Sequence, residues 1–210
     1  YDSNRYTLYG LLKGFGADII DMGVVKDDPL LLKETLITAS ENADAIITSG
    51  GVSVGEADHI KTVLKSVGEI KFWKILMKPG RPLAFGKIGT SQFYGLPGNP
   101  VSVMITFQQF VSHALSKMAG ESQSVPFEIP AKTTKAIRKG KDRTEFQRRI
   151  LSLDSEGGLL VTPLDSQGSG ILRSMTQANC LIHLSADIER IESRNLVKLH
   201  PFDLKLTVSN

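Results

Sequence analysis

Hydrophobic positions recur with two different periods along the chain, and the change of period divides the chain in two. In the first 120 residues, apolar side chains such as Leu8, Leu12 and Phe15 keep the spacing of three or four residues that is typical of an amphipathic helix. Short apolar runs such as residues 45–47 alternate with these helices and indicate buried strands. This alternation predicts an α/β fold, with a parallel or mixed sheet that carries helices on both faces.

Capping signals set the limits of the expected elements. Asp2 or Ser3 begins the first helix, which Gly14 and Gly16 end. A proline in the first turn follows a capping side chain at Asp28-Pro29 and again at Asn99-Pro100. We therefore expect further helices over residues 29–42, 58–66 and 100–119, and strands over residues 17–25, 45–48, 72–76, 82–85 and 92–96.

The pattern changes after Gly120. Residues 120–126 are polar, and beyond them the sequence predicts no helix. Short apolar runs with turn signals between them predict strands at 127–129, 145–153, 159–161, 178–184 and 195–199. We therefore predict an α/β domain over residues 1–122 and a small all-β, barrel-like domain over residues 126–206.

Composition narrows the classes of function. The net charge of +3 is too small to imply a nucleic-acid partner, and no apolar run approaches the roughly 18 residues of a membrane span. The single cysteine, Cys180, lies in an apolar run and is expected in the core, which fits a reducing cytoplasm. The four histidines show no metal-ligand spacing. A start at Tyr1, without methionine and directly on a capping sequence, suggests a fragment.

A glycine-rich stretch over residues 47–58, Ile-Thr-Ser-Gly-Gly-Val-Ser-Val-Gly-Glu-Ala-Asp, carries the strongest functional signal. It joins a buried strand to a helix, where glycines let the backbone approach a ligand and the helix start offers N–H groups to an anion. Ligands bind at this end of the strands in open α/β sheets. Glu56 and Asp58 suggest that a metal ion or a proton is handled there. A turn without a ligand is the alternative, because the dinucleotide fingerprint and the P-loop are absent.

Three further segments place polar groups on loops. Asp28 suits a helix cap. Its neighbour Asp27 is not needed as the cap, so Asp27 either has a functional role or has no specific role. Lys74 and Lys78 share one face of an extended chain and Arg81 follows on a stiff Pro-Gly-Arg-Pro tail, a set that suits a multiply charged oxyanion. The alternative is a basic edge strand that discourages aggregation.

The last of these segments is Gly-Leu-Pro-Gly-Asn-Pro-Val-Ser at residues 95–102. Asn99 and Pro100 are explained by a well-capped helix, but Pro97 and Gly98 are not. The first backbone amides of this helix and the hydroxyl of Ser102 make a second helix N-terminus that favours anions.

In this order the motifs closely resemble the molybdopterin molybdenumtransferases, a family that includes the C-terminal domain of gephyrin. The resemblance runs from Tyr1 to about Lys205. Its motifs are Asp-Ser-Asn at 2–4, Asp-Asp-Pro at 27–29, residues 49–58, Lys-Pro-Gly-Arg-Pro at 78–82, Leu-Pro-Gly-Asn-Pro-Val-Ser at 96–102, and the later segments 145–148 and 167–174.

The resemblance implies insertion of molybdate into adenylylated molybdopterin with release of AMP, assisted by Mg²⁺. It implies that Asp27 and Asp58 hold the metal and act in catalysis, together with Lys74 and Lys78. Lys78, Pro79, Ser102, Arg148 and Ser169 fall near the molybdate pocket, with Ser174 as an alternative to Ser169. With the residues read from the loops above, the expected substrate-binding set is Gly50, Gly51, Ser53, Gly55, Glu56, Pro79, Arg81, Pro97, Pro100, Ser102, Arg148 and Ser169.

The family's chain carries an N-terminal half with two further domains that help to form a dimer, and this sequence lacks them. A homodimer is therefore expected of the full-length protein, and turnover by the fragment stays open. One alternative is adenylylation of molybdopterin, the preceding step, although the β-domain after Gly120 argues against it. A scaffold or binding module is the other alternative, because gephyrin relatives bind receptor tails.

Overall fold

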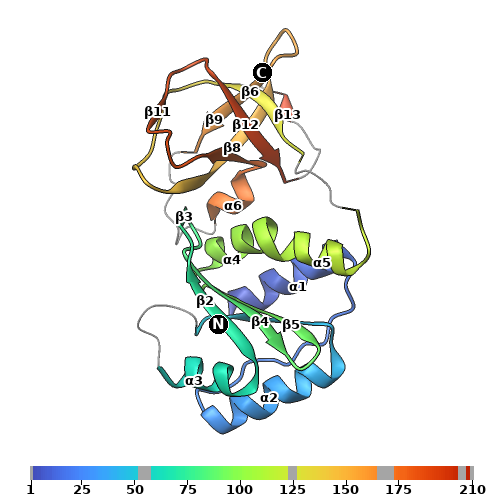
Figure 1. Cartoon of the computed structure of the whole chain (residues 1–210). Coiled ribbons are helices and arrows are strands. Elements are labelled where there is room, and N and C mark those ends of the chain that lie inside the picture. Colours follow the sequence, from blue (N-terminus) through green and yellow to red (C-terminus); the bar gives the residue numbers. More distant parts are fainter. Residues whose placement is uncertain (1, 52–57, 123–126, 165–172, 203–206, 209–210) are drawn as a thin grey trace. The chain divides into compact units, whose positions relative to one another are not determined.

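The computed structural model describes residues 2–51, 58–122, 127–164, 173–202 and 207–208, and the chain divides into two compact units (Figure 1). The first unit comprises Tyr1–Ile75 and Gly80–Ser122, and the second comprises Leu76–Pro79 and Gln123–Asn210. The sequence predicted domains over 1–122 and 126–206. The segment Leu76–Pro79, which that prediction placed in the first domain, belongs to the second unit.

The first unit is built on a four-stranded sheet with the order β1-β5-β4-β2. β1 and β5 are parallel, whereas β4 is antiparallel to both of its neighbours, so the sheet is mixed. Its strands are β1 (Ala45–Ser49), β2 (Glu69–Lys74), β4 (Pro82–Ile88) and β5 (Ser91–Leu96), and its helices are α1 (Ser3–Phe15), α2 (Pro29–Asn42), α3 (Asp58–Val67), α4 (Pro100–Thr106), the π-helical η1 (Phe107–Val111) and α5 (Ser112–Met118).

Helices cover both faces of this sheet, as predicted (Figure 1). Successive side chains of a strand point to opposite faces, so Phe93 and Tyr94 of β5 enter different cores. Phe93 packs with Leu36 of α2 and Leu64 of α3. Tyr94 packs with residues of α1, α4, η1 and α5. The sheet is therefore the middle layer of this unit.

The predicted caps begin the predicted helices. The Asp2 carboxylate accepts the Arg5 N–H, Asp28 accepts the N–H groups of Leu30 and Leu31, and Asn99 accepts the Ser102 N–H. Gly16 ends α1 with a φ of 89°, in the left-handed region that favours glycine. The single helix expected over 100–119 runs through the π-helical turn of η1.

The strand expected at residues 17–25 is wrong, because residues 17–25 form no helix or strand. A strand needs a neighbouring ladder, and no described strand pairs with this segment. Local contacts hold it instead: the Asp21 carboxylate accepts the Gly23 N–H, and Gly23 has a φ of 75°. The segment therefore has apolar residues but, among the described strands, no partner that would make it a strand.

The second unit contains a seven-stranded sheet that closes on itself, because β10 pairs with both β12 and β8. This matches the predicted barrel-like domain (Figure 1). Its elements are β3 (Met77–Lys78), β6 (Ile129–Thr133), β7 (Ile137–Arg138), β8 (Thr144–Leu153), β9 (Leu159–Pro163), α6 (Arg173–Gln177), β10 (Cys180–Leu184), β11 (Arg190–Ile191), β12 (Leu196–Pro201) and β13 (Thr207–Val208).

Cys180 lies in the core of this barrel, as predicted, and is fully buried beside Leu151 and Leu199. Burial raises the pKa of its thiol to about 12. The prediction of no helix beyond Gly120 is wrong, because α6 forms there. Five residues are too few to show a helical period in the sequence, and α6 is held by burial of Ser174 and Met175. Among the described helices, none is long and apolar enough to cross a membrane.

Candidate functional site

Three of the four predicted loop motifs meet at one edge of the sheet in the first unit. Because β1 and β5 are parallel, both end there, with Ser49 opposite Leu96. β2 ends at the same edge and β4 begins there, with Lys74 opposite Pro82. The glycine-rich turn after β1, the Pro-Gly-Asn-Pro loop after β5 and the Arg81-Pro82 tail before β4 therefore share this edge, as expected for ligand sites in open α/β sheets.

The two glycine-containing loops touch through their backbones. The Gly50 N–H donates to the Leu96 carbonyl at 3.1 Å, and a Cβ placed on Gly98 would lie 3.8 Å from the Gly50 Cα. Gly50 and Gly51 have φ values of 86° and 72°, which L side chains rarely adopt. The turn consequently requires glycine at both positions, as a backbone surface that receives a ligand would.

Asn4 fastens the second loop to helix α1. Its side-chain amide donates to the Gly98 carbonyl at 2.8 Å, and the residue is buried. Its other polar atom, Oδ1, has no hydrogen-bond partner among the described residues. The Ser102 hydroxyl is directed to the Asn99 cap, with 3.4 Å between Ser102 Oγ and Asn99 Oδ1. Ser102 thus takes part in the helix cap, and Pro97 and Pro100 lie on either side of the capping residue Asn99.

A cavity of about 590 Å³ opens beside this edge. Asp27, Ser49, Gly50 and Gly51 line it, together with apolar side chains of α1, α2 and β1. Asp27 is exposed and comes from the segment 19–27, which forms part of the same wall. The cavity combines an apolar floor with backbone amides and a carboxylate, a composition that suits an organic ligand with an anionic end.

Arg5 and Asp21 also line this cavity, and the sequence did not single them out. Arg5 Nε lies 2.9 Å from Asp21 Oδ1 and 3.0 Å from Oδ2. The hydrogen bond from Arg5 lowers the pKa of the Asp21 carboxyl below its ordinary value. The pair joins α1 to the segment 19–27, which ends at Asp27. Only the fold brings them together, because 16 positions separate them along the chain.

Several predicted residues lie outside the described part of the chain. Ser53, Gly55 and Glu56 belong to the segment 52–57, and Ser169 belongs to 165–172. Asp58 is the first residue of α3, but its side chain is also outside the description. Asp27 is therefore the member of the predicted metal pair whose position is known.

The predicted cation trio is divided between the two units. Lys74 and Arg81 lie in the first unit, where the Ile75 N–H donates to the Arg81 carbonyl at 2.8 Å and closes the turn between them. Both side chains are exposed. Lys78 belongs to the second unit, where β3 runs parallel to β8 with Lys78 opposite Glu145.

A second cavity, of about 480 Å³, lies in the second unit. Lys78, Pro79, Arg148 and Arg149 are among its lining residues, with Arg138, Lys139, Gly140, Glu145, Phe146 and Gln147. Five of these side chains are cationic and one is a carboxylate, so the lining favours an anion. Pro79 and Arg148 are buried, as a built site requires.

Polar contacts run along one face of β8 in this cavity. Lys78 Nζ lies 3.4 Å from Glu145 Oε1, and the Gln147 amide donates to Glu145 Oε2 at 2.9 Å. Arg149 donates to Gln147 Oε1 and, at 3.0 Å, to the Arg148 carbonyl. Residues 145, 147 and 149 share a face because side chains alternate along a strand. Within β8 the sequence pointed to Arg148 alone, although polar residues at every second position from 145 to 149 were a usable signal.

Burial disfavours the charged form of Arg148 and Arg149. It lowers the pKa of Arg149 to about 10 and also lowers the pKa of Arg148. Arg149 therefore stays cationic at neutral pH. A buried guanidinium gains most from an anionic partner, since little water solvates it. This cavity is the stronger candidate for an oxyanion.

Comparisons with known proteins agree with both units. Residues 1–117 match the family described as "Probable molybdopterin binding domain", and residues 130–202 match "MoeA C-terminal region (domain IV)". The chain therefore belongs to the molybdopterin-binding domain family, and the predicted resemblance and fold class are confirmed.

Individual relatives have consistent names. The chain is 39% identical over 204 residues to a molybdopterin molybdenumtransferase of Haemophilus influenzae, covering 97% of this chain and 50% of the relative. It is 34% identical over 229 residues to gephyrin of Dictyostelium discoideum, covering 94% and 32%. A crystal structure of a molybdopterin biosynthesis moeA protein from Pyrococcus horikoshii matches with a TM-score of 0.78 at 27% identity, covering 97% of this chain and 48% of that one. The chain thus spans half or less of the length of these relatives.

Proposed function

We propose that this chain takes part in molybdenum-cofactor synthesis as a piece of a molybdopterin molybdenumtransferase, which inserts molybdate into adenylylated molybdopterin and releases AMP. The observation that carries the proposal is the meeting of three loop motifs at one sheet edge beside the 590 Å³ cavity. The name of the Haemophilus influenzae relative, a molybdopterin molybdenumtransferase, supports the same reaction. The match of residues 130–202 to a MoeA C-terminal region favours it over the preceding adenylylation step.

In this proposal the first unit binds the adenylylated pterin. The cavity offers apolar side chains to flat rings, and the Gly50-Gly51 turn offers backbone N–H groups at the sheet edge to the phosphates. Lys74 and Arg81 are exposed at the same edge and contribute positive charge toward a phosphoanhydride. The chemistry needs such charge, because negative charge develops on the phosphate oxygens as the anhydride bond breaks.

The carboxylate of Asp27 fits a magnesium ion. It is exposed, lines the cavity and lies beside a turn that faces anions, and Mg²⁺ prefers oxygen ligands together with substrate phosphates. Asp27 would hold the ion together with Asp58 at the start of α3. When bound, the ion would neutralise the charge of the phosphate groups. The roles of Lys74 and Arg81 described above do not depend on it.

The second unit binds molybdate in this proposal. Molybdate is a tetrahedral dianion, and the cavity lined by Lys78, Pro79 and Arg148 has an excess of cationic side chains. Lys78 is exposed over 59% of its side chain and meets Glu145 at 3.4 Å, so it can turn to a stronger anionic partner. Arg148 is buried and fixed on a long strand.

We further propose that the reaction takes place in the cytoplasm, and we expect the whole protein to be a homodimer.

The test is rescue of a strain that lacks this transferase, scored by the activity of a molybdenum enzyme. The complete protein that contains this chain should restore the activity, and its Asp27→Asn variant should not, because an amide is a poor ligand for Mg²⁺. Asp28→Asn is the matched control, because Asp28 caps α2 and asparagine caps a helix as well as aspartate does. Equal rescue by Asp27→Asn and Asp28→Asn would remove Asp27 from the proposed site.

A further inference from the structure

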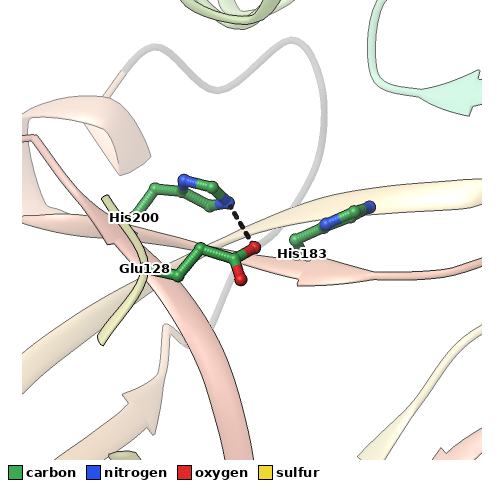
Figure 2. A group of neighbouring side chains, drawn as sticks. All are labelled: Glu128, His183 and His200. Atoms are coloured by element: carbon green, nitrogen blue, oxygen red, sulfur yellow. Dashed lines mark ion pairs between the residues drawn. The ribbon is translucent and has the colours of Figure 1, made fainter. Parts of the chain in front are cut away.

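Two histidines and a glutamate gather on the barrel of the second unit (Figure 2). Glu128, His183 and His200 each offer a ligand atom, and these atoms lie within 4.8 Å of one another. Figure 2 shows the Glu128 carboxylate between the two imidazole rings. His183 and His200 are 17 positions apart, so the cluster shows no metal-ligand spacing in the sequence and becomes visible only in the fold.

The register of three strands explains the cluster. β10 and β12 are antiparallel with Leu181 opposite His200, so His183, two positions further on, is the diagonal neighbour of His200 on the same face. β12 and β6 are antiparallel with Leu199 opposite Ile129. Glu128 directly precedes that pair and therefore reaches His200. Sequence separation conceals this arrangement, since Glu128 and His183 are 55 positions apart.

Contacts around the cluster divide the two carboxylate oxygens between different partners. Glu128 Oε1 lies 3.5 Å from His200 Nε2, whereas Glu128 Oε2 lies 2.9 Å from Lys198 Nζ. One oxygen thus faces the histidines while the other accepts from a lysine. An oxygen that binds a metal while its twin is held by a neighbouring side chain is a common arrangement in metal sites.

An aromatic side chain packs against the more exposed histidine. Phe146 of β8 stacks on His183, with 5.2 Å between ring centroids and 11° between planes. The centroids of His183 and His200 are 6.2 Å apart. Phe146 faces His183 across the β10–β8 pairing, so the ring rests on a fixed neighbour. Both imidazoles therefore lie beside the carboxylate before any ion binds.

We propose that Glu128, His183 and His200 form a zinc site on the barrel. Two imidazole nitrogens together with one carboxylate oxygen form a ligand set that Zn²⁺ favours, whereas Mg²⁺ prefers oxygen ligands alone. Bond lengths of about 2.1 Å place tetrahedral ligands about 3.4 Å apart, so the side chains need to close by about 1.4 Å. His183 is exposed and can make that adjustment. Three protein ligands leave the fourth position to water.

Zinc at this place would tie β10 and β12 to the residue that precedes β6. A ligand that binds only the folded chain stabilises it, so zinc should raise the melting temperature of the barrel. The site uses none of the residues of the proposed molybdenum insertion. Its success or failure is therefore separate from that proposal.

The experiment is a calorimetric titration of the purified 210-residue chain, without a polyhistidine tag, with zinc chloride in a non-chelating buffer at pH 7.5. We expect one ion per chain, no competition from millimolar Mg²⁺, and a rise in melting temperature. His183→Ala and Glu128→Gln should each weaken binding by at least about tenfold, since each removes a ligand. His113→Ala is the control, because this exposed histidine on α5 belongs to the other unit.

Glu128→Gln preserves the shape of the side chain, so it tests the site even if His183→Ala perturbs the fold, which circular dichroism would reveal. Absence of saturable zinc binding would overturn the proposal. Binding that neither His183→Ala nor Glu128→Gln weakens, or that His113→Ala weakens equally, would also overturn it.

Discussion

Lys78 and Glu145 face one another where β3 runs parallel to β8, with 3.4 Å between Lys78 Nζ and Glu145 Oε1. The pairing carries a residue of the Lys-Pro-Gly-Arg-Pro motif into the barrel unit. Glu145 is 10% exposed in its side chain and Lys78 is 59% exposed, so the carboxylate is fixed and the ammonium is not. Such a pair adds about 0–1 kcal/mol to stability and leaves the lysine available to a ligand.

Lys78→Ala should weaken the binding of molybdate to the 210-residue chain by about tenfold, because it removes one charge-assisted contact. Titration calorimetry at low ionic strength measures this, and affinity should fall as salt is added. Lys132→Ala is the control, since Lys132 is an exposed cation of β6 outside the cavity lining. If both variants bind molybdate equally well, Lys78 serves only the sheet edge.

Gly50→Ala should destabilise the chain by about 1–2 kcal/mol, because alanine resists a φ of 86° even where its Cβ meets no atom. Urea unfolding gives the free energy. Gly10→Ala provides the comparison: this glycine lies within α1 with equal space around it, and alanine there should stabilise by about 1 kcal/mol. The opposite signs separate backbone conformation from side-chain volume. A neutral Gly50→Ala would show that the turn does not require glycine.

Cys180 should resist alkylation in the folded chain. Its thiol is fully buried and has a pKa of about 12, and only the thiolate reacts. At pH 8, labelling by iodoacetamide should be at least about a hundredfold slower than in the urea-unfolded chain. Mass spectrometry follows the reaction. Equal rates in the two states would contradict the placement of Cys180 in the barrel core.

The Arg5–Asp21 pair should contribute stability in a defined pH range. Arg5 lowers the pKa of Asp21 in the folded chain below 3.8, so the stabilising effect is present above that pH and is lost as the pH falls through the folded value. Unfolding of the parent and of Asp21→Asn should therefore differ at neutral pH and converge in acid. Arg5→Met should abolish the difference. A gap between parent and Asp21→Asn that widens in acid would have the wrong sign.

Local signals predicted most elements of the fold because they act within a few residues. Asp2, Asp28 and Asn99 begin their helices as capping chemistry requires, and the apolar run around Cys180 forms a buried strand. The strand predicted over residues 17–25 was wrong, because apolar residues alone do not make a strand without a partner. Helix α6 was missed because one turn and a half shows no period.

Much of the candidate site could be anticipated, because loops that follow parallel strands meet at one edge. The remainder depends on register. Lys78 belongs to the barrel unit, apart from Lys74 and Arg81, because β3 pairs with β8 over two residues. Arg149 and Gln147 join the cavity because of strand alternation. His183 meets His200 through a diagonal contact that no sequence spacing reveals.

Release of AMP from adenylylated molybdopterin by the complete purified protein tests the central claim most directly. The account predicts AMP in step with molybdenum incorporation, only when molybdate and a divalent cation are both present, and loss of both products in Asp27→Asn but not in Asp28→Asn. Release of AMP at the same rate without molybdate, or incorporation of molybdenum by Asp27→Asn at the parent rate, would contradict it.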